Sequence, residues 1–308
     1  MKNKAAFVIV IVCTVICLFL IFTTLYYVFL LPHINLNTTN TSGIIDEKTA
    51  IKDNTPQDNS ISSTYNLDSY SKGISAKADE IFNTEYADFS VLVASPQNGN
   101  RVFSRNSDKQ MVSASVIKLF IMLHAYSEIK NGYTNDENVE KLVYSMITVS
   151  DNDATNSLID LYSFDAINAT ISKYGFRSTV LNRKMLDTEA QAKGIENYTS
   201  CDDCCRFLSM IYNRSLLGEK YDNIMLDILK HQQIATKIRA KLSGVSIANK
   251  TGELAAVEND VGIIFASETG GKDFIYCVLS GNVKQNDSAR NAIAEFAKYL
   301  YDESFELF

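Results

Sequence analysis

A serine and a lysine three residues apart begin a long apolar helical pattern in the middle of the chain. Ser115 and Lys118 stand in the sequence Ser-Val-Ile-Lys, which continues as LFIMLHAYSEI. This spacing places both side chains on one face of the first helical turn, where the helix N-terminus favours developing negative charge. A neutral lysine within reach of a hydroxyl accepts its proton if burial or a second cation lowers the lysine's pKa. The pair therefore suits nucleophilic catalysis, although taken alone it is also an N-cap serine followed by a solvated lysine.

A second polar triplet, Ser150-Asp151-Asn152, lies between two helical patterns. A serine hydroxyl at this position can relay a proton, and an asparagine amide can bind both the first lysine and a substrate carbonyl. Taken alone, the triplet is equally well explained as a helix cap.

A third triplet, Lys250-Thr251-Gly252, follows the strand-like sequence SIAN, and we expect it at the end of that strand. The lysine can pair with a substrate carboxylate, and glycine allows a substrate to approach the backbone along the strand edge. The alternative for this triplet alone is an exposed lysine beside a turn glycine.

The elements that must position these triplets are strands near both ends of the domain and helices between them. The turn sequence Pro-Gln-Asn-Gly at 96–99 predicts a hairpin between its flanking strands. Strands are predicted over 86–94, 101–104, 245–249, 257–266 and 274–280, and helices over 68–82, within 115–229 and over 287–301. The predicted fold class is α+β, with an antiparallel sheet built from both chain ends, flanking helices and an inserted all-α lobe.

The three motifs S-x-x-K, S-D-N and K-T-G, in this order and in these contexts, resemble those of class A β-lactamases and penicillin-binding proteins. The resemblance covers about residues 69–308 and is strongest to the class A branch. It implies that Ser115 is the acylated nucleophile and Lys118 its general base. It also implies that Ser150 passes the proton to the departing nitrogen.

The resemblance also implies a set of substrate-binding residues on the two later motifs. By this resemblance the substrate amide is bound by Asn152, and its carboxylate by Lys250 and Thr251 beside Gly252. The oxyanion is stabilised by the backbone N–H groups of Ser115 and Glu253, and one such donor is typically worth ~10²–10³ in rate. The implied ligand is a β-lactam, or the acyl-D-Ala-D-Ala stem peptide of peptidoglycan that β-lactams mimic. No cofactor and no metal are implied.

The chain departs from the class A pattern at the residue that activates the deacylating water. Those enzymes carry a glutamate in an Arg-x-Glu-x-x-Leu-Asn loop, and if Arg183 is the motif arginine, Met185 stands in the glutamate's place. A thioether cannot deprotonate water, and loss of a general base typically costs ~10²–10⁴ in rate. Asp187 and Glu189 are the possible replacements, unless both are ordinary loop carboxylates.

Two further expectations concern the same region. Arg183 is expected to pin its loop through a carboxylate such as Asp202 or Asp203. Only 35 residues separate Ser115 from Ser150, fewer than in β-lactamases of this class, so part of the helical lobe beside the site is expected to be trimmed. A more open groove suits a peptide or glycan-linked substrate.

Three functional hypotheses follow for the domain. It is a serine β-lactamase that hydrolyses the β-lactam amide, slowly if the loop glutamate is not replaced by another base; a penicillin-binding D-Ala-D-Ala peptidase acting on peptidoglycan; or a non-catalytic wall-binding module. The intact Ser115, Lys118, Ser150 and Lys250 argue against the last.

The N-terminal part predicts a membrane anchor and a tether. Residues 5–31 contain no charge, and roughly 20 apolar residues suffice to cross ~30 Å of hydrocarbon. Lys2 and Lys4 precede this segment, so the positive-inside rule keeps the N-terminus in the cytoplasm. The predicted organisation is a single-pass transmembrane anchor over 1–32, a polar extracytoplasmic tether over 33–68, and a hydrolase domain over 69–308 in the bacterial cell membrane. A cleaved signal peptide is the alternative, but its apolar region is shorter and ends in a small-residue site.

Composition excludes some partners and leaves the cysteines open. With 29 Lys and Arg against 36 Asp and Glu, the chain has no excess of positive charge for a nucleic acid. We expect a monomer. Cys201, Cys204 and Cys205 are expected to be buried on one helix, with a disulfide among them or to Cys277 as the alternative. None of the three histidines has motif context, so a Ser-His-Asp triad is not predicted.

Overall fold

The computed structural model of the chain describes residues 72–133 and 136–307. The predicted membrane anchor and tether, over 1–32 and 33–68, lie outside the described residues. Within the described ranges, no helix combines the length and apolar character needed to span a bilayer. The description below concerns the domain that follows the predicted tether.

A five-stranded antiparallel sheet is assembled from both ends of this domain, as the sequence predicts. Its strands lie in the order β2-β1-β7-β6-β5. They are β1 (Asp88–Ala94), β2 (Arg101–Arg105), β5 (Ile247–Leu254), β6 (Val257–Ile264) and β7 (Phe274–Gly281). The predicted hairpin is confirmed, since β1 pairs with β2 across the 96–99 turn, with an irregularity in register between Val93 and Ala94. The predicted α+β fold class is thereby confirmed.

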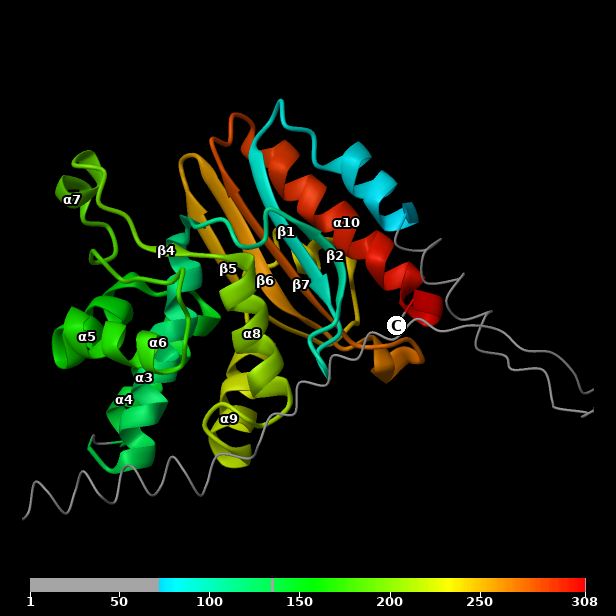
Figure 1. Cartoon of the computed structure of the whole chain (residues 1–308). Coiled ribbons are helices and arrows are strands. Elements are labelled where there is room, and N and C mark those ends of the chain that lie inside the picture. The colour runs from blue at the N-terminus through cyan, green and yellow to red at the C-terminus, as the bar shows by residue number, and fades with distance from the viewer. Residues whose placement is uncertain (1–71, 134–135, 308) are drawn as a thin grey trace, which may run out of the picture. The chain divides into compact units, whose positions relative to one another are not determined.

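Two layers of helix cover the two faces of this sheet (Figure 1). Along β7, Ile275, Cys277 and Leu279 point into one hydrophobic core, and the alternating Phe274, Tyr276 and Val278 point into the other. The second core is closed by α10 (Asn286–Leu307) and by a helix that includes residues 72–81. The strand period of two thus divides one buried strand between two cores.

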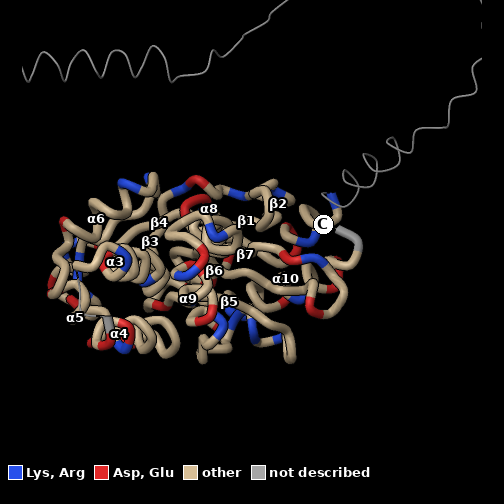
Figure 2. Tube along the Cα trace, turned by 90° about the horizontal axis from the view of Figure 1, so that it is seen from below, with Lys and Arg blue, Asp and Glu red and all other residues tan. Residues whose placement is uncertain are grey.

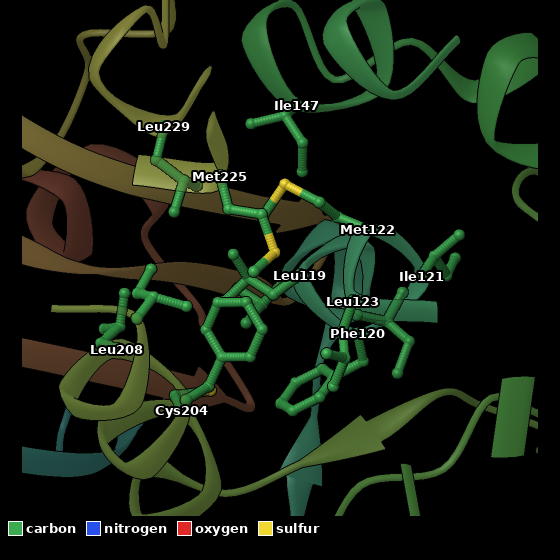
Figure 3. Close-up of a cluster of buried hydrophobic side chains, with 14 of the residues drawn as sticks. Leu119, Phe120, Ile121, Met122, Leu123, Ile147, Cys204, Leu208, Met225 and Leu229 are labelled. Carbon is green, nitrogen blue, oxygen red and sulfur yellow. The ribbon is translucent and has the colours of Figure 1, made fainter. Parts of the chain in front are cut away.

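The helical lobe covers the opposite face of the sheet and surrounds a central helix, α3 (Lys118–Asn131). All but three of the 14 residues of α3 are buried. Figure 3 shows the side chains of α3 packed among side chains of neighbouring helices, including those of Ile147, Leu208 and Met225. The other helices of the lobe are α4 (Asp136–Thr148), α5 (Asn152–Tyr162), α6 (Phe164–Lys173), α7 (Thr188–Ala192), α8 (Cys201–Tyr212) and α9 (Glu219–Lys230). A helix that is buried nearly all round makes a rigid base for residues at its first turn.

Short elements join the lobe to the sheet. A two-stranded ribbon pairs β3 (Met111–Val112) with β4 (Tyr198–Thr199), and the 3-10 turns η1 (Ala114–Ile117), η2 (Ile238–Lys241) and η3 (Ala266–Thr269) lie between larger elements. Figure 2 shows basic and acidic residues interspersed along the described trace.

Two sequence predictions about local structure were wrong. Lys250, Thr251 and Gly252 lie inside β5 and not at its end, because β5 and β6 pair continuously from Ile247↔Ile264 to Leu254↔Val257. Ser115 does not begin the α-helix but lies in η1, and α3 starts at Lys118. In both cases tertiary pairing, which a local pattern does not contain, sets the boundary.

Candidate active site

The turn that carries Ser115 is fixed from two sides. The backbone N–H of Ser113 donates to the carbonyl of Asn197 at 2.8 Å, and the carbonyl of Ser113 accepts from Asn259 Nδ2 at 3.1 Å. Ala114 has a positive φ of 45°, a region that L-residues seldom occupy. Ser115 follows directly and is half-buried. Such strain persists where the surrounding structure enforces it, and the serine that follows lines a pocket.

Strand β5 passes so close to this turn that there is no room for a side chain at Gly252. A Cβ atom on Gly252 would lie 2.8 Å from the carbonyl oxygen of Ser113 and 3.2 Å from the backbone nitrogen of Ser115. Only glycine fits at this crossing. Gly252 therefore brings the K-T-G strand next to the serine, as the resemblance implies.

Two buried lysines meet at Ser150. Lys118 Nζ donates to the Ser150 carbonyl at 2.8 Å, to Ser150 Oγ at 3.2 Å and to Asn152 Oδ1 at 2.9 Å. Lys250 Nζ reaches the same Ser150 Oγ at 3.1 Å and the Thr251 carbonyl at 2.8 Å. One hydroxyl thus connects the first lysine to the second. The structure brings all three motifs together.

Burial changes the protonation of both lysines. It lowers the pKa of Lys118 from 10.5 to about 7, and the charge of Asp151 opposes only part of this shift. Burial, followed by repulsion from Lys118, lowers the pKa of Lys250 well below its usual value, while Asp260 acts in the opposite direction. A lysine with a pKa near neutrality exists partly as the free amine, which is the form that accepts a proton.

The S-D-N residues are held at a tight junction between α4 and α5. Ser150 has a positive φ of 58°, and Asp151 caps α5 by accepting from the backbone N–H groups of Asp153 and Ala154. Asn152 Oδ1 accepts a hydrogen bond from Lys118 Nζ. Its Nδ2 group makes no hydrogen bond within the described ranges, and Asn152 lines a pocket together with Ser115. The amide N–H₂ is therefore free to donate to a ligand carbonyl.

Met185 lines this pocket because Asn156 fixes its backbone. Asn156 Oδ1 accepts from the N–H of Met185 at 2.8 Å, and Asn156 Nδ2 donates to its carbonyl at 3.1 Å. The Met185 side chain is buried, and the pocket that it lines also contains Ser115 and Asn152. A thioether residue thus lines the pocket of Ser115 at the position where the resemblance places a carboxylate.

The partner expected for Arg183 was wrong. Arg183 donates through Nε and Nη2 to Glu196 Oε2 at 2.9 and 2.7 Å, and not to Asp202 or Asp203. Asp202 pairs instead with Arg101, and Asp203 accepts from the backbone N–H of Ser178. The ion pair between Arg183 and Glu196 therefore joins two parts of the same loop, and it does not attach the loop to α8.

The two carboxylates considered as replacement bases lie elsewhere on this loop. Asp187 caps α7 by accepting from the N–H of Ala190 at 2.9 Å, and Glu189 is exposed on α7. Neither lines the pocket that contains Ser115, whereas Glu196 does.

Several residues of the site carried no recognised signal in the sequence. Asn156 is one, although its position four residues after Asn152 places it on the same face of α5. Asn197 and Lys237 are others. Lys237 is fully buried and binds Glu253 and Glu258, and it stands in no motif.

The cysteines and histidines do not contribute to the site. Cys201, Cys204 and Cys205 are buried on α8, which confirms the expected helix, and these three and Cys277 are free in the structure. The four cysteines belong to no metal-binding group of three or more residues within the described ranges. His124 Nδ1 lies 2.7 Å from Thr170 Oγ1, inside the lobe, and forms no triad with Ser115.

The arrangement has the parts that acyl transfer needs. These are a half-buried serine on a strained turn, a lysine with a pKa near 7, a hydroxyl linking two lysines, and a strand edge beside the serine.

Comparisons with known proteins agree with this geometry. The sequence model of the beta-lactamase enzyme family matches residues 73–140 and 133–304. A search of curated protein sequences found no match. Among solved structures, a beta-lactamase from Sphaerobacter thermophilus is 25% identical with a TM-score of 0.65, covering 77% of this chain and 98% of its own.

Two more distant structures share the fold. The extended-spectrum beta-lactamase TLA-3 is 17% identical with a TM-score of 0.69, covering 77% of this chain and 100% of its own. The L158E mutant of PBP-A, solved as an acyl-enzyme complex with penicillin G, is 20% identical with a TM-score of 0.66, covering 77% of this chain and 96% of its own.

Proposed function

We propose that this chain, which belongs to the beta-lactamase enzyme family, is acylated on Ser115 by β-lactams and hydrolyses the resulting ester slowly. The observation that carries the proposal is the pair of buried lysines joined through Ser150 Oγ beside the serine turn. The acyl-enzyme of the PBP-A mutant with penicillin G is a precedent for the same chemistry on a similar fold.

In the proposed acylation, Ser115 Oγ attacks the carbonyl carbon of the lactam. The free amine of Lys118 takes the hydroxyl proton, and the backbone N–H groups of Ser115 and Glu253 stabilise the oxyanion. The carbon–nitrogen bond then breaks, and the nitrogen receives a proton from Ser150, which is resupplied by one of the two lysines. A serine ester and an amine result.

Substrate binding is assigned to the residues that surround this reaction. Asn152 Nδ2 donates to the substrate amide carbonyl, and Lys250 and Thr251 bind the carboxylate next to the lactam nitrogen. Gly252 lets the substrate lie along the edge of β5, since a side chain there would meet the serine turn.

Slow deacylation is proposed because of Met185. Its side chain occupies the wall of the pocket that contains Ser115 and can neither accept a proton from water nor hold a water by a strong hydrogen bond. Asp187 and Glu189 remain candidates for the deacylation base only after a movement of the loop, because neither lines this pocket.

A second candidate function is a penicillin-binding peptidase that acts on acyl-D-Ala-D-Ala peptides. Met185 favours it, since a long-lived penicilloyl ester is compatible with a peptidase that uses another acceptor or tolerates slow turnover. A non-catalytic wall-binding module is the weakest candidate, because binding alone does not require two buried lysines that are linked through Ser150 Oγ.

The location of the protein is part of the proposal. The uncharged segment over residues 5–31 supports a single-pass anchor with the hydrolase domain outside the cytoplasmic membrane of a bacterium. The domain is proposed to act as a monomer.

Intact-mass spectrometry of the full-length chain with benzylpenicillin tests the function. We expect the mass of one penicilloyl group on Ser115 that persists for hours, none on Ser115→Ala, and an unchanged adduct on the control Ser157→Ala, whose hydroxyl bonds the Asp153 carbonyl on α5. Loss of the adduct within seconds with consumption of the drug identifies an efficient β-lactamase. An adduct that survives Ser115→Ala contradicts the assignment of the nucleophile. Release of D-Ala from a D-Ala-D-Ala peptide identifies the peptidase.

A further inference from the structure

Asp260 is a buried carboxylate on β6 that lies directly across from the K-T-G strand. It is 1% exposed and is paired with Thr251 in the register between β5 and β6. Its two oxygens accept from neutral groups, Oδ1 from Asn249 Nδ2 at 2.9 Å and Oδ2 from the backbone N–H of Ile238 at 3.0 Å. Hydrogen bonds from neutral groups do not cancel the charge of a buried carboxylate, so Asp260 needs positive charge nearby.

Other charged groups around the end of β5 form direct ion pairs among themselves. These pairs join Lys237 to Glu253 and Glu258 at 2.5 and 3.0 Å, and Arg290 to Glu253, Glu258 and Asp287 at 3.9, 2.8 and 3.6 Å. None of these ion pairs includes Asp260. The two cations of this group therefore act on Asp260 only from a distance.

Two further cations near Asp260 are bound by neutral groups. Arg239 Nε donates to Asn249 Oδ1 at 2.7 Å, and the nitrogen of the same amide donates to Asp260. One amide thus separates Arg239 from Asp260, and the charge of Asp260 opposes the lowering of the arginine's pKa by burial. Lys250 Nζ likewise donates to neutral oxygens. Because neighbouring residues of a strand point to opposite faces, Lys250 and Thr251 do so, and the charge of Asp260 reaches Lys250 through β5 and not by contact.

The charge of Lys250 depends on a balance between burial and four charged groups. Burial lowers the pKa of Lys250 well below its usual value. The charged groups that act on it are Lys118 on α3, Asp260 on β6, Lys237 before η2 and Glu253 on β5. The two lysines lower the pKa further, and the two carboxylates raise it, Asp260 more than Glu253. Asp260 is therefore the strongest of the influences that keep this lysine protonated, and only the protonated form attracts an anion.

We propose that Asp260 is a positioning residue that keeps Lys250 cationic and so sustains the binding of a substrate carboxylate beside Thr251. Asp260 acts through Lys250 and touches no substrate itself. The substrate class preferred by the site is then an acyl donor with a free carboxylate next to the reacting amide. This inference rests on the proposed acylation of Ser115, and it adds the residue that maintains the charge of the carboxylate-binding lysine.

The test compares two acyl donors that differ by one charge, benzylpenicillin and its methyl ester. The second-order rate constant of acylation is measured by intact mass on the full-length chain between pH 5 and 9, and the ratio of rates, anionic over neutral, is followed against pH. Both donors need the same proton transfers through Lys118 and Ser150, so that part of the pH dependence cancels in the ratio. We expect the ratio to exceed one at low pH and to fall as Lys250 loses its proton.

Asp260→Asn removes the charge and keeps the shape of the side chain. We expect the midpoint of the fall in the ratio to move to lower pH by roughly one unit, because Lys250 then loses its proton more easily. The matched control is Asp273→Asn. Asp273 is also buried and accepts from one side chain and one backbone N–H, those of Tyr212 and Ser267. We expect this control to leave the midpoint unchanged.

Two further measurements separate the charge effect from a loss of structure. Asp260→Ser is the second variant, in case the first does not fold, and acylation by the methyl ester reports folding in both. Lower rates for both donors with an unshifted midpoint mean that Asp260 only supports the sheet, and they overturn the inference. A ratio near one at every pH in the wild-type chain overturns it without any variant, since Lys250 then binds no carboxylate. If neither donor forms an adduct on Ser115, the proposed function fails and this inference fails with it.

Discussion

The side-chain amide of Asn156 binds both backbone groups of Met185, which holds the thioether in the pocket of Ser115. The two bonds, at 2.8 and 3.1 Å, use the oxygen and the nitrogen of one amide. Because the backbone is held in this way, a different side chain at 185 would enter the same space. Substitutions at position 185 therefore test how the side chain there affects the lifetime of the proposed Ser115 ester.

Replacing Met185 by glutamate should accelerate deacylation. A carboxylate at this position can activate a water next to the Ser115 ester, and a general base typically contributes ~10²–10⁴ in rate. The rate at which the penicilloyl mass disappears after removal of free drug measures the effect. The control is Leu161→Glu on α5, since Leu161 is exposed and does not line this pocket, and we expect its replacement to leave the ester lifetime unchanged. A stable ester in Met185→Glu would show that deacylation is limited by something other than the missing base.

Acylation should depend on the protonation of Lys118. Its pKa of about 7 means that the fraction of free amine, and with it the acylation rate, rises tenfold per pH unit below pH 7 and levels off above it. Lys118→Arg should abolish this dependence and lower the rate by roughly 10²–10⁴, because a guanidinium does not deprotonate. Stopped-flow acylation between pH 5 and 9 is the measurement, with the exposed Lys141→Arg as control. A flat profile in the wild type would exclude Lys118 as the base.

Adding one methyl group at Gly252 should impair acylation. The new Cβ would lie 2.8 Å from the Ser113 carbonyl and 3.2 Å from the Ser115 nitrogen, so the serine turn must shift. A displacement of about 1 Å typically costs ~10² in rate. The control Gly73→Ala adds a Cβ that meets only Tyr299 Oη at 3.6 Å. Acylation at the wild-type rate in Gly252→Ala would mean that the strand and the turn are free to separate.

His124 should make the domain less stable in acid. Burial lowers the pKa of His124 to about 4, so between about pH 6.5 and 4 the unfolded chain binds a proton that the folded domain does not. The free energy of unfolding should therefore fall by about 2–3 kcal/mol as the pH decreases through this window. Urea unfolding at several pH values measures the slope, and His124→Gln should reduce it. An equal slope in His124→Gln and in the exposed His231→Gln would place the acid sensitivity elsewhere.

The four buried thiols should be unreactive in the folded domain. Burial raises the pKa of Cys201 and of Cys205 to about 12, and raises the pKa of Cys204 and Cys277 well above the usual value. The thiolate is the reactive form, so iodoacetamide at pH 8 should label these residues only after unfolding. Peptide mapping by mass spectrometry, with and without urea, distinguishes them from Cys13 and Cys17. Rapid labelling of Cys201, Cys204 or Cys205 in the native domain would show that α8 opens locally.

Local patterns predicted the parts of the site that lie within one short segment, and the resemblance predicted that the three motifs meet, but contacts outside the motifs could not be predicted from the sequence. Ser115 and Lys118 share one turn, and Ser150 and Asn152 share one junction, so local spacing was enough. The partner of Arg183 was wrong because the sequence does not say how the loop folds back, and Glu196 is brought to it only by that fold.

The same reason explains the errors in the sheet. Strand β5 was expected to end before Lys250, since lysine and glycine are both depleted in strands. Its pairing with β6 buries Lys250 and Thr251 and continues the strand to Leu254. On the other hand, the hairpin turn at 96–99 is a local signal and was confirmed.

The pairing of β1 with β7 has a consequence for biosynthesis. The register Asp88↔Gly281 to Ala94↔Ile275 joins the first and the last strand of the domain. During translation β1 is therefore synthesised long before β7, its partner in the middle of the sheet. The lobe helices are also synthesised before the sheet on which they pack is complete. Such non-local closure slows folding and leaves apolar strands exposed meanwhile. A chain that ends before β7 lacks the middle strand of its sheet, so we expect early termination of synthesis to yield a fragment that aggregates and not a smaller folded domain.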